Sequence, residues 1–259
     1  MERTRKGKLE GKRALVTAGG QGIGLAIVRE LLEAGCQVCV HYFSSEPDLA
    51  GLRSESGASQ ERKLSAFQAD LCREGEAEAL VRAAVESMGG LDILINNAGS
   101  LVERRQLEEV DPEFYGRVMD LNLASMVRVT RAALPALKQA GQASVVNLSS
   151  LAGRKGGHGG SLLYATAKGA VLTWTRALSA ELAPAGIRVN AVAPGLILGT
   201  SFHATHTTEE SARETIRGIP LGRAGNPADV ARAVAYLASE YDGFITGATI
   251  DINGGVYCA

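Results

Sequence analysis

The sequence lacks the features that mark nucleic-acid-binding, membrane-spanning and disulfide-stabilised proteins. Its 259 residues include 27 Lys and Arg against 28 Asp and Glu, a balance that gives no field to gather nucleic acid or an anionic membrane surface. No apolar run approaches the ~20 residues of a membrane-spanning helix. The four cysteines are too few for a disulfide scaffold in a chain of this length, so we expect reduced thiols and a cytoplasmic location.

What the chain does contain is enough apolar material for a large core, since 46% of its residues are hydrophobic and 21% are charged. Short apolar runs alternate with longer helical patterns. Several runs are apolar at every position, which suits strands covered by helices on both sides. Strands are predicted at residues 14–17, 38–42, 65–69, 91–96, 144–149, 188–193 and 248–252. We therefore predict a single α/β domain over residues 1–259, a doubly wound parallel sheet of Rossmann type with about seven strands and helices on both faces.

Helix boundaries are marked by capping residues. The pattern at 22–34 ends before Gly35, a favourable C-terminal cap. Asp111, Pro112 and Glu113 predict the start of another helix, with a capping carboxylate, a proline in the first turn and a second carboxylate that the helix dipole favours. A third pattern covers residues 162–183.

One region, residues 195–218, is irregular and mixes Gly, Thr, His and Glu. Ligands of such folds bind beyond the carboxyl ends of the strands, where a mobile loop can cover them. We expect this segment to be a substrate lid; the alternative is a variable surface loop.

A glycine-rich turn, TAGGQGIG at residues 17–24, follows the first predicted strand and opens the first predicted helix. Glycines let the backbone approach a pyrophosphate closely, and the helix N-terminus offers N–H groups and positive potential. The turn therefore predicts nucleotide binding, although glycine at a strand–helix turn can also serve packing alone.

The spacing of this turn resembles T-G-x-x-x-G-x-G, the signature of the short-chain dehydrogenase/reductase family. The first glycine of the family pattern is Ala18 here, which we expect to be tolerated with a negative φ, as alanine requires. Other segments resemble family motifs in the same order from about Lys12 onward: Asn96-Asn97-Ala98-Gly99, Ser150, Tyr164-x-x-x-Lys168, Pro194-Gly195, Pro220-Leu221-Gly222-Arg223, Pro227-x-Asp229-Val230, and Gly247 with Asp251 and Gly254-Gly255.

Tyr164 and Lys168 are four residues apart and would share one face of a helix. The ordinary pKa of a phenol is about 10, and a neighbouring ammonium favours the phenolate, so we expect Lys168 to bring the tyrosine nearer to working pH. Such a pair alone is usually surface decoration. The family resemblance implies that Tyr164 is the general acid/base, that Lys168 also binds the nicotinamide ribose, and that Asn122 supports Lys168 through a water.

Ser150 ends a predicted strand and can donate a hydrogen bond to a substrate oxygen as charge develops there. Ser149 is its rival, and the alternation of a strand sends the two side chains to opposite faces. The family register favours Ser150.

The resemblance also implies a set of cofactor-binding residues. They are Thr17, Gly20, Gln21, Gly22, Ile23, Gly24, Ser44, Ser45, Asp70, Leu71, Asn97, Ala98, Gly99, Tyr164, Lys168, Pro194, Gly195 and Ile197.

Cofactor choice depends on the residues after the second strand, where NAD enzymes carry an Asp or Glu. Tyr42 occupies that position, and the hydroxyls of Ser44 and Ser45 could bind a 2′-phosphate without repulsion. Against this, no Arg or Lys is adjacent, Gln21 replaces an arginine frequent in NADP-binding turns, and Glu46 is close. We expect NADP(H), with NAD(H) as the alternative.

No metal site is expected. Cys36 and Cys39 have the C-x-x-C spacing, but an odd separation on a strand directs them to opposite faces. His203 and His206 lack a clear third ligand. The basic residues of the loop after Ser150, among them Arg154, are interpreted as a solvated loop rather than a site for an anionic substrate.

The sequence thus predicts an NADP(H)-dependent oxidoreductase acting on a small-molecule carbonyl or secondary alcohol. Within the family it most resembles 3-oxoacyl-[acyl-carrier-protein] reductases. Sugar or polyol dehydrogenases are the alternative, and a non-catalytic nucleotide-binding regulatory protein is the alternative of another class. The family commonly forms tetramers, and the predicted helix at 162–183 is apolar on several faces, so we expect a homotetramer.

Overall fold

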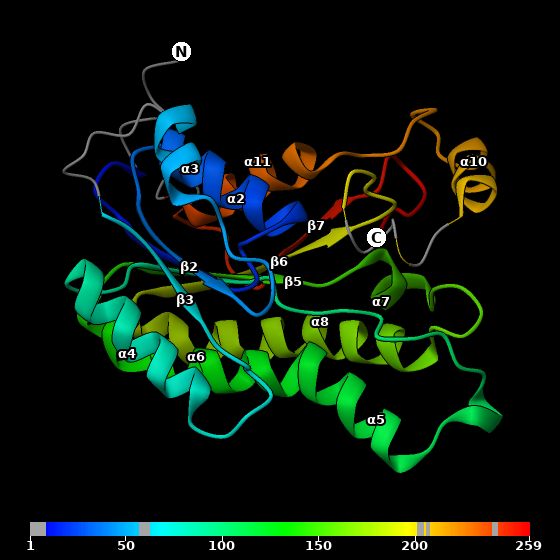
Figure 1. Ribbon diagram of the computed structural model, residues 1–259, viewed down its shortest axis with the longest axis horizontal. Coiled ribbons are helices and arrows are strands. Elements are labelled where there is room, and N and C mark those ends of the chain that lie inside the picture. Colours follow the sequence, from blue (N-terminus) through cyan, green and yellow to red (C-terminus); the bar gives the residue numbers. More distant parts are fainter. Residues whose placement is uncertain (1–8, 57–62, 201–204, 206–207, 240–242) are drawn as a thin grey trace.

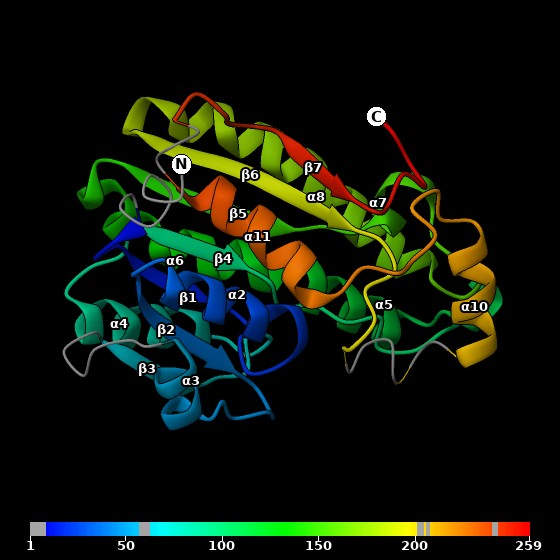
Figure 2. The same cartoon turned by 90° about the horizontal axis from the view of Figure 1, so that it is seen from above.

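The computed structural model describes residues 9–56, 63–200, 205, 208–239 and 243–259. Seven parallel strands form one sheet in the order β3-β2-β1-β4-β5-β6-β7 (Figures 1 and 2). This order confirms the predicted doubly wound sheet. The strands are β1 (Arg13–Val16), β2 (Gln37–Tyr42), β3 (Leu64–Gln68), β4 (Ile93–Asn96), β5 (Ala143–Leu148), β6 (Ile187–Pro194) and β7 (Thr249–Ile252).

Helices cover both faces of the sheet. On one face lie α2 (Gly22–Glu33), α3 (Leu49–Ser56) and α11 (Pro227–Ala238); on the other lie α4 (Glu76–Met88), α6 (Ser125–Ala140) and α8 (Leu162–Leu182) (Figures 1 and 2). The remaining helices are α5 (Pro112–Met119), α7 (Leu151–Lys155), α10 (Glu209–Arg217), the 3₁₀ turns at Leu107–Glu109 and Ala183–Ala185, and a π-helical turn at Asp120–Ala124. Among the described residues, no helix combines the length and apolarity needed to cross a bilayer.

Two hydrophobic cores lie on the two faces of the sheet. Successive residues of β4 alternate between them: Ile93 and Ile95 pack with α2 and α11, whereas Leu94 packs with α4, α6 and α8. Cys36 and Cys39 also belong to different cores, as their odd separation predicts. Strands β1, β2, β4, β5 and β6 are therefore buried between two helical layers, as their apolar sequences require, whereas β3 and β7 at the two ends of the sheet are less buried.

The start of α5 follows the predicted capping pattern. The side chain of Asp111 accepts a hydrogen bond of 2.7 Å from the N–H of Phe114, and Pro112 occupies the first turn. The cap therefore fixes where α5 begins. The helix lies toward the carboxyl edge of the sheet, where α7 and α10 also lie (Figure 2).

The segment predicted to be a lid is only partly described. Its second half forms α10, where Thr208 caps the helix by accepting from the N–H of Ser211 and where only Ala212 is buried. His203 and His206 lie outside the described residues. Closure of this segment over a substrate stays a prediction.

Candidate active site

The glycine-rich turn connects β1 to α2 at the carboxyl edge. A Cβ atom at Gly20 would overlap the carbonyl oxygen of Ser45, and one at Gly24 would overlap that of Ala18. These two glycines are thus required by the packing of the turn itself. Within the described residues, no side chain caps the first turn of α2, whose N-cap is Gln21. The uncapped N-terminus, with the backbone of the turn around it, fits a pyrophosphate, so the residues present suit a dinucleotide.

Ala18 adopts a φ of +50°, so the expectation of a negative φ is wrong. The left-handed conformation costs an L-residue about 1–2 kcal/mol, which is why the family pattern has glycine here. Hydrogen bonds on both sides hold the alanine in this conformation. Its N–H donates to Nδ1 of His41 at 3.0 Å, and its carbonyl oxygen accepts from Nδ2 of Asn97 at 3.0 Å.

Thr17 and the segment after β4 brace the same turn. The Thr17 hydroxyl donates to the carbonyl oxygen of Ile95 at 3.2 Å and accepts from the N–H groups of Asn97 and Ala98 at 2.9 and 3.0 Å. Three of the predicted cofactor-binding residues therefore act on the turn that would hold the dinucleotide.

Ser150, Tyr164 and Lys168 come together where β5 ends and α8 begins. The Ser150 hydroxyl hydrogen-bonds the Tyr164 hydroxyl and also caps α7 by accepting from the N–H of Ala152 at 3.1 Å. Ser149 points elsewhere: it is buried and donates to the carbonyl oxygen of Lys168 at 2.7 Å. The strand alternation thus leaves Ser150 as the serine beside the tyrosine.

Lys168 and Asn122 lie around Gly99. Nζ of Lys168 is 5.8 Å from the centre of the Tyr164 ring. A Cβ atom at Gly99 would come within 2.7 Å of Oδ1 of Asn122 and 2.8 Å of Nζ of Lys168. Asn122 sits in the π-helical turn and exchanges hydrogen bonds with the backbone of Ser100, accepting at 3.1 Å and donating at 2.8 Å. The predicted water between Asn122 and Lys168 stays a prediction.

Burial controls the protonation of the tyrosine–lysine pair. It raises the pKa of Tyr164, and the hydrogen bond from Ser150 offsets this only in part. This direction is opposite to the expected one, because desolvation of the phenolate by burial is the largest effect on the pKa. Burial also lowers the pKa of Lys168 to about 8. Both shifts favour the neutral forms of two groups enclosed in the protein.

The segment after β2 contains the residues expected to select between NADP(H) and NAD(H): the two serines and Glu46. Ser44 is exposed and Ser45 half-buried, with its carbonyl oxygen against Gly20. Partial burial and the neighbouring carboxylate of Glu46, which accepts a hydrogen bond from the Tyr42 hydroxyl, raise the pKa of Tyr42. A carboxylate therefore lies at this edge although residue 42 itself is not acidic.

The remaining predicted cofactor residues follow β3 and β6. The carboxylate of Asp70 accepts a hydrogen bond from the N–H of Cys72 at 3.1 Å. The carbonyl oxygen of the buried Leu71 accepts a hydrogen bond from Arg128. Gly195 continues from Pro194 and donates its N–H to Ile252 at 2.9 Å. Ile197 is buried in the core, so only its backbone could reach a ligand.

Two contacts at this edge were not predicted. His41 hydrogen-bonds the turn at Ala18, as described above. Arg154 forms a two-pronged ion pair with Asp251, with Nε and Nη2 each 3.0 Å from a carboxylate oxygen and both side chains mostly buried. The interpretation of Arg154 as part of a solvated loop is therefore wrong. Neither contact could be predicted from local sequence patterns, since His41 and Ala18 are 23 residues apart and Arg154 and Asp251 are 97 residues apart.

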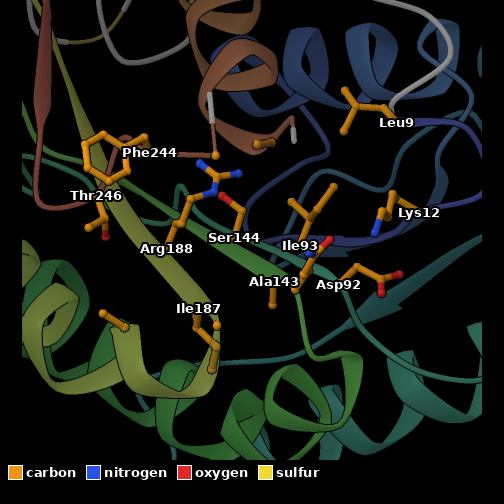
Figure 3. Close-up of a pocket in the computed structure, with 15 residues that line it drawn as sticks. Leu9, Lys12, Asp92, Ile93, Ala143, Ser144, Ile187, Arg188, Phe244 and Thr246 are labelled. Atoms are coloured by element: carbon orange, nitrogen blue, oxygen red, sulfur yellow. The ribbon is translucent and has the colours of Figure 1, made fainter. Parts of the chain in front are cut away.

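A cavity of about 470 Å³ lies at the opposite edge of the sheet. Figure 3 shows Ile93, Ala143 and Ile187 on its wall, and these residues begin β4, β5 and β6. The described residues that line it include none of the predicted site residues. We therefore place the candidate active site at the carboxyl edge.

Comparisons with known proteins agree on one family. A family model described as enoyl-(acyl carrier protein) reductase matches residues 17–257. An uncharacterized oxidoreductase of Methylorubrum extorquens is 39% identical over 253 residues, which cover 96% of this chain and 99% of the relative. A 3-oxoacyl-[acyl-carrier-protein] reductase of Vibrio cholerae is 35% identical, with 96% and 98% covered. The crystal structure of the NADH-dependent reductase A1-R′ complexed with NAD superposes with a TM-score of 0.84 at 35% identity and covers 98% of this chain and 100% of that one.

Proposed function

Since the chain belongs to the short-chain dehydrogenase/reductase family, we propose that it transfers a hydride between NADP(H) and the carbon of a carbonyl or secondary alcohol, most like a 3-oxoacyl-[acyl-carrier-protein] reductase. One observation carries the proposal: Ser150, Tyr164 and Lys168 converge at the carboxyl edge that also holds the uncapped N-terminus of α2. Ligands of doubly wound folds bind at this edge.

The side chains divide the chemistry of reduction among them. A bound reduced nicotinamide supplies the hydride that the carbonyl carbon gains. Tyr164 donates its phenolic proton to the carbonyl oxygen, so that the substrate leaves as an alcohol, and a raised pKa keeps that proton in place at neutral pH. Ser150 donates a hydrogen bond to the same oxygen as negative charge develops on it. Lys168, supported by Asn122 through a water, stabilises the phenolate that remains and binds the nicotinamide ribose.

The cofactor proposal rests on the end of β2. Residue 42 is a tyrosine, and the hydroxyls of Ser44 and Ser45 can donate hydrogen bonds to a 2′-phosphate and carry no negative charge. NAD(H) is the alternative, which two observations favour: the Glu46 carboxylate at the Tyr42 hydroxyl, and the likeness to a reductase structure that contains NAD. A carboxylate there would accept hydrogen bonds from ribose hydroxyls and repel a 2′-phosphate.

We also propose that the protein is cytoplasmic and forms a homotetramer. In each subunit, residues 195–218 would form the substrate lid. Four cysteines are too few for a disulfide scaffold in a chain of 259 residues, which supports a reducing compartment. The face of α8 away from the sheet carries exposed residues such as Thr173 and Ala177, small enough for close approach of a second helix.

A substrate screen tests the proposed function. Wild-type protein would be assayed with NADPH and NADH against 3-oxoacyl thioesters, enoyl thioesters, keto sugars and simple ketones, with oxidation of the cofactor as the readout. We expect turnover of a carbonyl, highest for the 3-oxoacyl thioesters. Turnover of enoyl thioesters alone, or dinucleotide binding with no turnover of any compound, would contradict the proposal.

A further inference from the structure

His41 is a buried imidazole that the proposed chemistry does not use. Its side chain lies at the end of β2 and is only 2% exposed. Nδ1 of the ring accepts the N–H of Ala18 at 3.0 Å, and Nε2 lies 3.1 Å from the carbonyl oxygen of Ala69. The backbone carbonyl of His41 accepts the N–H of the next turn residue, Gly19, at 2.8 Å. One residue thus holds two successive amides of the glycine-rich turn.

These contacts fix the form of the ring. Because Nδ1 accepts the N–H of Ala18, it must carry a lone pair, so the ring proton is on Nε2, which donates to the carbonyl oxygen of Ala69. Burial lowers the pKa of His41, which favours the same neutral form. The ring is therefore a fixed bridge with one acceptor and one donor.

The bridge connects two segments that the dinucleotide would contact. One end is Ala18, the left-handed residue of the turn. The other end is Ala69, which directly precedes Asp70 and Leu71. Without the hydrogen bond that its N–H donates to His41, Ala18 can relax toward a negative φ, which an alanine prefers, and this would rotate the peptides of the turn.

We propose that His41 is a positioning residue for the dinucleotide, which keeps Ala18 in the left-handed conformation that the cofactor turn needs and sets the distance between that turn and the segment at Asp70. The proposal rests on the proposed dinucleotide-dependent function. His41 touches no reacting atom in this account, so its effect is on cofactor affinity and not on the chemical step.

Two substitutions of His41 separate the effect of its hydrogen bond with Ala18 from the effect of changing a buried side chain. Asn places Oδ1 close to where Nδ1 of histidine lies and keeps an acceptor for the N–H of Ala18. Leu has a similar size to asparagine but offers no acceptor. Each would be made in the wild-type chain and in an Ala18→Gly background, where glycine adopts a positive φ without the cost that alanine has.

The readouts are the Kd values of NADPH and NADH, measured by fluorescence of the reduced nicotinamide, the Tm of the cofactor-free protein, and KM and kcat. We expect His41→Leu to raise the Kd about tenfold, since Ala18 then leaves the left-handed conformation that the turn needs, with kcat changed less than about twofold. His41→Asn should stay within about threefold of the wild-type Kd. In the Ala18→Gly background, the effect of His41→Leu on Kd should fall to about threefold or less.

A Kd for His41→Leu within about twofold of wild type would overturn the proposal, as would an equal effect in both backgrounds. A lowered Tm with unchanged Kd would show a role in stability alone. If His41→Leu does not fold, His41→Gln replaces it, because its longer side chain lacks an acceptor at the Nδ1 position and the same results are expected. Failure of the wild-type protein to bind either dinucleotide would overturn the proposed function together with this inference, and is distinguishable from failure of the inference alone.

Discussion

Lys168 donates a hydrogen bond of 2.9 Å from its ammonium group to the backbone carbonyl of Leu148, and the lysine is only 4% exposed. Leu148 is the last residue of β5 and directly precedes the serine pair. This bond therefore connects the helix that carries the tyrosine to the end of β5, two residues before Ser150. A charged group held at such depth has consequences for stability as well as for chemistry.

Replacing Lys168 by Met should stabilise the cofactor-free protein at neutral pH. Burial lowers the pKa of Lys168 from 10.5 to about 8, which corresponds to about 3 kcal/mol of unfavourable free energy for the charged form. Loss of the bond to Leu148 offsets about 1 kcal/mol of this gain. We expect a net increase of about 2 kcal/mol in the free energy of unfolding at pH 7, measured by chemical denaturation.

The sign of the pH dependence follows from linkage. Below pH 8 the lysine is charged in both states and the wild-type chain bears the full cost. Between pH 8 and 10.5 the unfolded state binds more protons, so the wild-type protein gains stability relative to Lys168→Met and the advantage of the variant disappears. Lys155→Met, at an exposed lysine of α7, is the control and should change stability by less than about 0.5 kcal/mol. An advantage of Lys168→Met that does not vary with pH would contradict this account.

Ala18→Gly should stabilise the fold. The substitution removes about 1–2 kcal/mol of left-handed strain from the folded state. It also increases the entropy of the unfolded chain, which costs about 0.4–1 kcal/mol of stability. We therefore expect the free energy of unfolding to rise by about 0.5–1 kcal/mol. Ala34→Gly, at the end of α2 where φ is −76°, is the matched control and should destabilise. Urea denaturation of both variants checks the prediction, and a loss of stability in Ala18→Gly would show that the alanine is not strained.

The ion pair between Arg154 and Asp251 should contribute more than a surface pair. Asp251→Asn leaves a mostly buried guanidinium without its carboxylate, and we expect a loss of about 2 kcal/mol. Glu55→Gln breaks the exposed pair between Arg29 and Glu55 and should cost less than about 1 kcal/mol. Equal losses in the two variants, measured by chemical denaturation, would argue against a special role for the buried pair.

Glu46→Gln tests what selects the cofactor. Removal of the carboxylate beside Tyr42 should raise kcat/KM for NADPH relative to NADH by about tenfold, since repulsion of a 2′-phosphate is lost. Tyr42→Asp should shift the ratio in the opposite direction. Glu33→Gln, on the exposed surface at the end of α2, makes the same change in net charge and should leave the ratio unchanged. If Glu46→Gln also leaves it unchanged, Glu46 does not face the ribose.

The parts of the fold that follow from local pattern could be predicted from the sequence. The strands could be predicted because runs such as residues 93–95 are apolar on both faces. The start of α5 could be predicted because Asp111 and Pro112, which form its cap and first turn, are adjacent in the chain. Ser150, Tyr164 and Lys168 were identifiable because their spacing matches a family motif.

The features that were missed depend on contacts between distant residues. The φ of Ala18 is set by His41 and Asn97, and nothing in the turn sequence shows that they hold it. The direction of the pKa of Tyr164 depends on how deeply the fold encloses the ring, which residue spacing does not reveal. Neither could be derived before the strands were placed side by side.

The central claim is that Tyr164 moves the proton to and from the substrate oxygen, and Tyr164→Phe in single-turnover and steady-state assays tests it most directly. The variant should bind NADPH with a Kd within about twofold of wild type, because the ring remains. Its kcat should fall on the order of 10²–10⁴-fold, the usual contribution of general acid–base catalysis. Tyr115→Phe, at an exposed tyrosine of α5, should retain full activity. Turnover by Tyr164→Phe within about threefold of wild type would contradict the account.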